Sequence, residues 1–391
     1  MAIVCTHWIM QSHAQHMGDR FLTGYPLKGK WHRSPLDVVS LYVDQKPEGD
    51  QTAARAEEFG FAIYPTIAEA LCRGGDRLAV DAVLTIGEHG NYPVDERGQK
   101  HYPRYEFFKQ VTDVFRKSGR SVPVFNDKHL SWNYAWSMEM VAISKELKFP
   151  FLAGSSLPMT WRMPAIDLPY DAMVDEALVV AYGGLDVYDF HALETLQCMV
   201  ERRKGGETGV AWVEVLKGEA VWQALAKNSW DAGGWSRRLF EACLSRTQTL
   251  GQARAGFGHR YPTDEDARQL VKEPFAYRIQ YRDGLKASVL MLNGLVKDFT
   301  FAAQLRGQSE PLSTLFYLPP QTNVVYSAAL MSKVEEMFIT GKAPWPVERT
   351  LLTSGLVHFG LTSLHENSRR LDTPQLDVRY TAPRESQFWR D

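Results

Sequence analysis

The feature that most constrains the fold is an alternation, over the first 155 residues, of short β-rich apolar runs with amphipathic segments. We expect strands at residues 2–5, 38–43, 80–86 and 122–125, with weaker candidates at 61–64 and 149–152. Helices are expected at residues 52–59, 104–117 and 134–147. Such alternation is typical of strands and crossover helices in a parallel sheet, and near-continuous apolar runs suit strands covered on both faces. The first part of the chain is therefore predicted to be a doubly wound α/β domain.

The pattern changes after a proline-marked stretch at residues 158–169, which predicts a domain boundary near 155–165. Beyond it we expect a helix and several strands, two of them in a hairpin through Asp283-Gly284. The tail after Glu366 is polar and is expected to be a surface arm. The predicted organisation is residues 1–157, then an α+β domain with a mostly antiparallel open sheet at residues 158–391. The expected elements of this second domain are a helix at 191–203, strands at 208–216, 276–282, 285–292 and 296–305, and helices at 325–339 and 347–365.

Composition excludes several classes of protein. The 44 Lys and Arg against 46 Asp and Glu leave a formal charge of -2, and no basic block offers the surface that nucleic acid requires. No apolar run approaches the ~20 residues of a membrane-spanning helix. The four cysteines lie far apart, without metal-ligand or disulfide-framework spacing, and no signal peptide is evident. We expect a cytoplasmic protein with neither nucleic acid nor membrane as partner.

Polar side chains that could take part in catalysis or metal binding follow three of the predicted strands. Because the carboxyl ends of neighbouring parallel strands meet in one crevice, we expect these side chains to converge. Imidazoles and carboxylates together suit proton transfer near neutral pH, and they also suit Mn or Zn. The plainer alternative is that they only cap helices or face solvent. The residues concerned are Ser12, His13, Glu88, His89, Asp127, Lys128 and His129, with His13, Glu88, His89 and His129 as the metal candidates.

Four segments carry a resemblance to a known family. They are VVSLYVDQ with the following ARAEEFGFAIYPTIAEAL, VDAVLTIGEHGNYP, VPVFNDKHL and AYGGLDVYDFHALETL. Together they resemble the Gfo/Idh/MocA oxidoreductases, which are sugar and cyclitol dehydrogenases with an N-terminal Rossmann domain and a C-terminal α/β sheet domain. The resemblance covers most of the chain and implies a small carbohydrate-like substrate.

The resemblance also implies a nicotinamide cofactor, NAD or NADP. It brings Asp44 to the position that binds the adenosine ribose, and it places Ser12, Glu88 and His89 beside the cofactor. The sequence departs from the family at this point. No glycine lies between Cys5 and Gly18, although a dinucleotide-binding turn needs glycines there, and Asp44 follows the first strand by more than 30 residues.

The same resemblance assigns the catalytic roles. Lys128 corresponds to the lysine that contacts the reacting sugar hydroxyl, Asp127 to the acidic residue that orients it, and His191 to the catalytic histidine. The family further implies a homodimer or homotetramer packed through the open faces of the second-domain sheets. An exposed apolar sheet face would need such cover.

Three alternatives for function stay open. The first is a carbohydrate-active enzyme that moves a proton, and with NAD also a hydride. The second is a cofactor-independent or metal-dependent lyase, hydratase or epimerase, and the third is a non-catalytic sugar-binding or regulatory protein. In each case we expect Trp132, Trp161 and Arg162 near the substrate, because aromatic faces stack on sugar rings. The long polar segment at residues 88–104 is expected to form an ordered lid.

Overall fold

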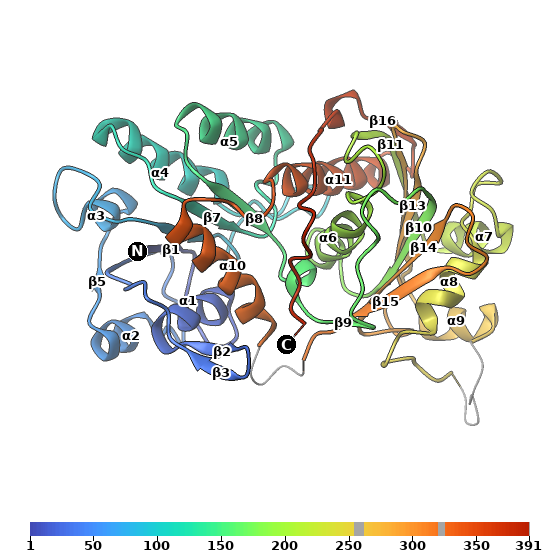
Figure 1. Cartoon of the computed structure of the whole chain (residues 1–391), viewed down its shortest axis with the longest axis horizontal. Helices are drawn as coiled ribbons and strands as arrows, with labels where there is room; N and C mark the ends of the chain where they lie inside the picture. The colour runs from blue at the N-terminus through green and yellow to red at the C-terminus, as the bar shows by residue number, and fades with distance from the viewer. Residues whose placement is uncertain (254–261, 320–324, 391) are drawn as a thin grey trace.

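The computed structural model describes residues 1–253, 262–319 and 325–390, which form two sheets with their helices (Figure 1). The first sheet lies in the left half of the view and the second in the right half, with helices α6 (Tyr188–Val200) and α11 (Glu348–His365) in the middle. The chain crosses between the halves after residue 154, at the end of the last strand of the first sheet.

The first sheet has six strands in the order β5-β4-β1-β6-β7-β8, and all of its pairings are parallel. The chain winds outward in one direction from β1 and then in the other, so that β1 and β6 flank the switch point of a doubly wound sheet. This confirms the predicted fold class. The strands are β1 (Ala2–Cys5), β4 (Ser40–Val43), β5 (Ala62–Ile63), β6 (Val83–Ile86), β7 (Val124–Asp127) and β8 (Phe151–Gly154).

Helices cover both faces of this sheet. Helix α4 buries Phe108, Val111 and Phe115 along one stripe. The residues between α1 and β4 form a small hairpin of β2 (Tyr25–Leu27) and β3 (Lys30–His32), which the sequence did not predict. The helices are α1 (His13–Thr23), α2 (Thr52–Phe59), α3 (Ile67–Cys72), α4 (Arg104–Ser118) and α5 (Tyr134–Glu146).

The second sheet has eight strands in the order β16-β11-β12-β13-β10-β14-β15-β9. Only β10 and β13 pair in parallel; the other pairings are antiparallel, and the predicted hairpin joins β12 to β13. Strand β10, at the centre of the sheet, was missed from the sequence. The strands are β9 (Arg162–Met163), β10 (Val174–Ala181), β11 (Val210–Lys217), β12 (Phe275–Tyr281), β13 (Lys286–Met291), β14 (Phe299–Leu305), β15 (Leu312–Phe316) and β16 (Leu371–Asp372).

Both faces of the second sheet are covered by the chain itself. Helices α6 and α11 lie on the inner face, while α7 (Glu219–Lys227), α8 (Arg237–Leu244) and α9 (Asp264–Leu270) lie on the outer one (Figure 1). Leu178 and Leu290 of the sheet pack in one cluster with Leu239 and Phe240 of α8. The homodimer or homotetramer was expected because an exposed apolar face of this sheet would need cover. Helices of the same chain cover that face.

Helix α10 (Tyr326–Thr340) returns from the second half of the molecule to the first sheet, where it contacts α1. Leu330 and Val334 join Ile3 and Leu84 in one buried cluster. A late segment of the chain thus completes the core of the first sheet.

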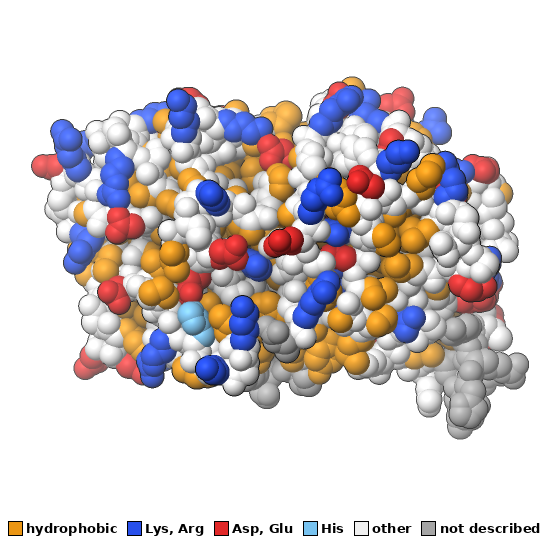
Figure 2. Space-filling view, viewed as in Figure 1, with side chains coloured by type: hydrophobic (Ala, Val, Ile, Leu, Met, Phe, Trp, Pro, Cys, Tyr) orange, Lys and Arg blue, Asp and Glu red, His pale blue; other side chains and the backbone are white. Residues whose placement is uncertain are grey.

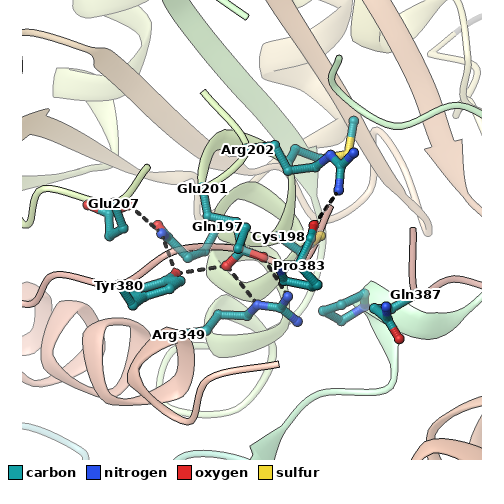
Figure 3. Close-up of polar contacts among 12 residues, drawn as sticks. Gln197, Cys198, Glu201, Arg202, Glu207, Arg349, Tyr380, Pro383 and Gln387 are labelled. Atoms are coloured by element: carbon teal, nitrogen blue, oxygen red, sulfur yellow. Dashed lines mark hydrogen bonds and ion pairs between the residues drawn. The ribbon is translucent and has the colours of Figure 1, made fainter. Parts of the chain in front are cut away.

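The tail beyond Glu366 is not a free surface arm, which corrects the prediction (Figure 3). Tyr380 donates a hydrogen bond to Glu201 at 2.8 Å, and Arg202 donates one to the Pro383 carbonyl at 2.9 Å. Further along, Phe388 is buried. The tail has few apolar residues, but their burial and these hydrogen bonds hold it against α6.

Three features bear on the excluded classes. Within the described residues, no helix has both the length and the apolar character to cross a bilayer. Lys, Arg, Asp and Glu are interspersed over the face seen in Figure 2. All four cysteines are free and buried.

Candidate active site

A cleft of about 500 Å³ lies between the two halves of the molecule, within the usual size range of small-molecule sites. The carboxyl ends of β6 and β7 and the start of α1 form one wall, and the start of α6 forms the other. The predicted convergence of the strand ends is therefore observed. The charged and imidazole side chains that carry the argument below are His13, His16, Glu88, His89, Lys128 and His191.

Glu88 is the centre of a buried group of charges. Lys128 Nζ lies 3.1 Å from one carboxylate oxygen, and Arg104 donates a hydrogen bond to the other. All three side chains are buried. Burial opposes the ionisation of Glu88, but the two cations outweigh it and hold the pKa of Glu88 well below its usual value. Glu88 is therefore a carboxylate that holds Lys128 in a fixed position.

The backbone at these strand ends is strained. Lys128 has a φ of 61° and His89 a φ of 68°, in the left-handed region that non-glycine residues rarely adopt. The Lys128 amide donates to the Gly154 carbonyl at 3.2 Å, which ties this turn to the end of β8. Strain of this kind collects where a side chain must be aimed precisely at a ligand.

Asp127 serves a different residue from the one expected. Its carboxylate lies 2.6 Å from Nδ1 of His13, the first residue of α1. The resemblance assigned Asp127 to orient Lys128, whereas the structure gives that place to Glu88. His13 lines the cleft, so Asp127 orients an imidazole toward it.

His191 faces the cleft from the first turn of α6. Its Nδ1 lies 2.5 Å from Ser155 Oγ, and its ring contacts Tyr188. Desolvation, followed by the charges of Lys128 and His13, holds the pKa of His191 well below its usual value. His191 is thus a neutral imidazole that can accept a proton. Ser155 and Tyr188 were not singled out from the sequence.

Two other imidazoles of the cleft, those of His16 and His89, are also neutral. Desolvation and the nearby charge of His13 lower the pKa of His16 to about 3 and that of His89 to about 4. The His89 ring stacks on His7 at 5.7 Å and meets His13 edge-on at 5.1 Å. These rings therefore form one contiguous imidazole surface.

The metal hypothesis finds no support in residues 1–253, 262–319 and 325–390, where no three His, Cys, Asp or Glu side chains are placed to hold an ion. Two of the four candidates are engaged elsewhere, because Glu88 binds Lys128 and Arg104, and His129 accepts a hydrogen bond of 2.9 Å from Arg104. His129 is buried behind Glu88, where desolvation and then Arg104 hold its pKa well below normal.

A buried carboxyl links the expected lid to the second domain. Asp186 accepts hydrogen bonds from the Gln99 side chain at 3.1 Å and from the Lys100 amide at 2.9 Å. Desolvation, and after it the nearby Asp189, raise the pKa of Asp186 to about 7, despite these donors. The segment at residues 88–104 is therefore ordered across the junction of the two halves.

The residues at the β1 and β4 ends do not fit a nicotinamide dinucleotide. The two oxygens of the Asp44 carboxylate accept hydrogen bonds from Tyr42 at 2.9 Å and Tyr92 at 2.7 Å. Ser12 Oγ caps α1 by accepting from the Gln15 amide. Both residues predicted to hold the far end of the cofactor are thus engaged with the chain itself, whereas Glu88 and His89 line the cleft.

The three predicted substrate contacts lie away from the cleft lining. Trp132 stacks on His101 at 3.7 Å, and Trp161 packs against Trp389 of the tail at 5.2 Å. Arg162 is buried and pairs with Asp167. The sequence placed these residues near the domain junction, but it could not indicate which side of the junction they would face.

No protein-family model and no curated sequence matches this chain. Solved structures do match its fold. GenD2 of gentamicin A biosynthesis, solved with NAD, is 10% identical with a TM-score of 0.58, over 95% of this chain and 96% of that one. A probable dehydrogenase from Thermotoga maritima is 11% identical with a TM-score of 0.56, over 96% and 100%.

A third structure is the myo-inositol dehydrogenase from Lactobacillus casei, solved with NAD(H) and myo-inositol. It is 11% identical with a TM-score of 0.55, over 95% of this chain and 96% of that one. The likeness extends over both halves of the molecule and agrees with the resemblance that the sequence motifs carry. The chain thus has the two-domain fold of the Gfo/Idh/MocA-type dehydrogenases.

Proposed function

We propose that this chain is an enzyme that acts on a small carbohydrate- or cyclitol-like molecule in the cleft between its two halves. The observation that carries the proposal is that Lys128, held by Glu88, and the neutral His191 line opposite walls of one cleft. A matched cation and base with perturbed surroundings is typical of a catalytic centre. Fold relatives solved with NAD and with myo-inositol support the class of substrate.

The cleft suits a polyhydroxylated ring. The hydroxyl groups of Tyr182, Tyr188 and Tyr326 and of Ser156 and Ser327 are among its lining side chains. Such groups can exchange hydrogen bonds with ring hydroxyls, while the aromatic faces pack on the C–H faces of the ring.

The proposed chemistry is proton transfer. His191 takes a proton from a hydroxyl, or from the carbon next to a carbonyl, and Lys128 donates a hydrogen bond to the oxygen on which negative charge develops. Glu88 and Arg104 keep the lysine in place, and His13 with Asp127 offers a second proton donor on the wall of the first domain.

Hydride transfer to a nicotinamide is the second candidate, favoured by the relatives solved with NAD. We derive no step through it, because the contacts of Asp44 and Ser12 do not fit the cofactor. A purely binding protein has little physical reason to bury the Lys128, Glu88 and Arg104 group at a strained turn.

The test is proton exchange at carbon. The intact protein is incubated in D2O with a panel of sugars, cyclitols and their keto and acid derivatives, without added nicotinamide, and followed by NMR. We expect deuterium incorporation or a new product with at least one of them, and a loss of roughly 100-fold or more in His191→Asn, as for removal of a general base.

The matched control is His365→Asn, which changes a half-exposed histidine at the end of α11, far along the chain from the cleft residues. It should leave the exchange rate unchanged. Turnover that is equal in the wild type, His191→Asn and Lys128→Met would contradict the proposed function.

A further inference from the structure

We infer that this chain works without a nicotinamide dinucleotide, because the segment between β1 and α1 (residues 6–12) fills the crevice in which a doubly wound sheet holds one and contributes to the catalytic cleft instead. The inference concerns the cofactor and the class of reaction, and it rests on the proposed function only for the chemistry of the cleft.

A doubly wound sheet binds a dinucleotide through three features. Glycines after β1 let the backbone approach the pyrophosphate, the first helix offers free amides at its N-terminus, and an acidic residue after the second strand receives the ribose hydroxyls. The chain can be compared with each in turn.

The first feature is replaced by a bulky, closed segment. Trp8 is completely buried, and its ring packs on α1 so closely that a Cβ at Gly18 would lie 2.3 Å from it. The backbone of the segment is bonded across to the residues after β4, because the Gln45 amide donates to the Thr6 carbonyl and the Gln51 amide to the Trp8 carbonyl, each at 2.8 Å. The gap between the ends of β1 and β4 is therefore bridged by protein.

The residues at the places of the other two features are also bound to other parts of the chain. Asp44 is held by two tyrosines, one of which, Tyr92, lies in the segment after β6. The neighbouring Gln45 side chain bonds the backbone amide and carbonyl of Asn91, at 2.9 and 3.1 Å. These contacts tie the segment after β6 to the residues after β4, beside Asp44, and Ser12 Oγ accepts from the Gln15 amide at the start of α1.

Residues 6–12 also contact residues of the candidate active site. The Thr6 hydroxyl donates to the carbonyl of Glu88, and the His7 ring stacks on His89 at 5.7 Å. Directly after the segment, His13 binds Asp127 and lines the cleft. Residues that would hold a pyrophosphate thus support the turn that carries Glu88.

Without a hydride acceptor the reaction must be redox-neutral. A base removes a proton from the carbon next to a carbonyl, and the electron pair of the C–H bond moves onto the oxygen that Lys128 contacts. His13, the donor on the opposite wall, then delivers a proton to the other face of that carbon, which gives an epimer, or the β-hydroxyl takes the proton held by His191 and leaves as water. In either case no electrons leave the substrate.

Two measurements on the intact protein test the inference. In calorimetric titrations with NAD+, NADH, NADP+ and NADPH we expect no saturable binding up to roughly 1 mM, the upper end of ordinary enzyme affinities. The protein as purified is also denatured, one portion with acid to release NAD+ and NADP+ and another with alkali to release NADH and NADPH, and both supernatants are analysed for nucleotides; we expect none. Saturable binding of any of the four, or a stoichiometric dinucleotide in the supernatant, would overturn the inference.

The failure of this inference can be distinguished from the failure of the proposed function. Dinucleotide binding by a protein whose turnover still depends on Lys128 and His191 would overturn the cofactor inference alone. Turnover that is unchanged in the Lys128 and His191 variants, in a protein that binds no dinucleotide, would overturn the proposed function and leave the cofactor inference intact.

Discussion

The carboxyl edge of the first sheet has two parts that follow the same topology but differ in construction. At the ends of β1 and β4 the chain packs on itself, with Trp8 buried and Asp44 held by tyrosine hydroxyls. At the ends of β6 and β7 it leaves a cleft, beside which Glu88 and Lys128 are buried as charges. One edge can therefore supply a filled half and a reactive half.

The two halves differ in ionisation more than in the backbone. His89 and Lys128 of the open half have a positive φ, but so does Gln11 at the end of the filled segment, at 61°. In the open half, burial opposes the ionisation of Glu88, and Lys128 and Arg104 nevertheless hold its pKa well below the usual value. The filled half is held by packing and by hydrogen bonds from two tyrosines to Asp44.

The largest effect is expected from Glu88→Gln. It removes the charge that two buried cations share, and breaking a buried pair costs roughly 3–5 kcal/mol. Urea denaturation should show this loss in the free energy of unfolding, together with loss of turnover. Glu336→Gln is the control, because its partner Lys333 lies on the surface. A loss no larger than that of the control would show that the open half stores no such energy.

Lys128→Met should come next. It removes the donor aimed at the developing oxyanion while keeping most of the side-chain volume, and such donors are worth roughly 100- to 1000-fold in kcat. Steady-state kinetics should place the loss in kcat more than in KM. Lys109→Met, which changes a partly exposed lysine paired with Glu139, should have no effect on turnover. A change in KM alone would contradict the assigned role.

Asp186 predicts a pH dependence of stability. Burial raises its pKa in the folded protein to about 7, above the ordinary value of 3.8, so the folded state keeps a proton that the unfolded chain releases. This contribution to stability is fully present below pH 3.8 and is lost as the pH rises toward 7. The melting temperature should fall as the pH rises from 3.8 to about 7, and the fall should be smaller in Asp186→Asn than in the wild type.

The neighbouring Asp189, whose pKa burial raises to about 6, acts in the same direction and will remain in the variant. Asp81→Asn, at an exposed ion pair, is the control and should follow the wild-type curve. A variant curve that coincides with the wild type would show that Asp186 titrates normally.

The smallest effect is expected in the filled half. Tyr92→Phe removes one hydrogen bond to Asp44 at a half-buried position, worth about 0.5–1.5 kcal/mol of stability. Turnover should not change, because Tyr92 does not line the cleft. A strong loss of activity at full stability would instead give the β4 end a part in the reaction.

Much of the fold could be predicted because its signals are local. The parallel strands are continuous apolar runs, and Asp283-Gly284 marks a hairpin wherever it joins two of them. Helix α1 was missed because polar residues, among them His13, Gln15 and His16, separate its few apolar positions. In strand β10, Asp175 and Glu176 follow the first residue, Val174, and they obscured the apolar second half of the strand.

The site was predictable to the level of topology. The meeting of the β6 and β7 ends follows from strand order, so Glu88, Lys128 and His13 could be expected together. Which carboxylate pairs with which partner could not be predicted, because Asp127 directly precedes Lys128 in the sequence and yet binds His13, while the distant Glu88 binds Lys128; side-chain direction decides the pairing. The filling of the β1 and β4 ends depends on contacts between segments far apart along the chain, such as Asp44 with Tyr92, which are 48 residues apart.

Helix α10 makes the two halves inseparable. Its apolar side chains cover Ile3 and Leu84 of the first sheet, although the helix follows nearly all of the second sheet along the chain. A fragment that stopped at residue 157 would expose this surface to water and should aggregate. Tyr326 at the start of α10 also lines the cleft, so the fragment would lack part of the cleft wall as well. Neither half could therefore be moved to another protein as an independent module.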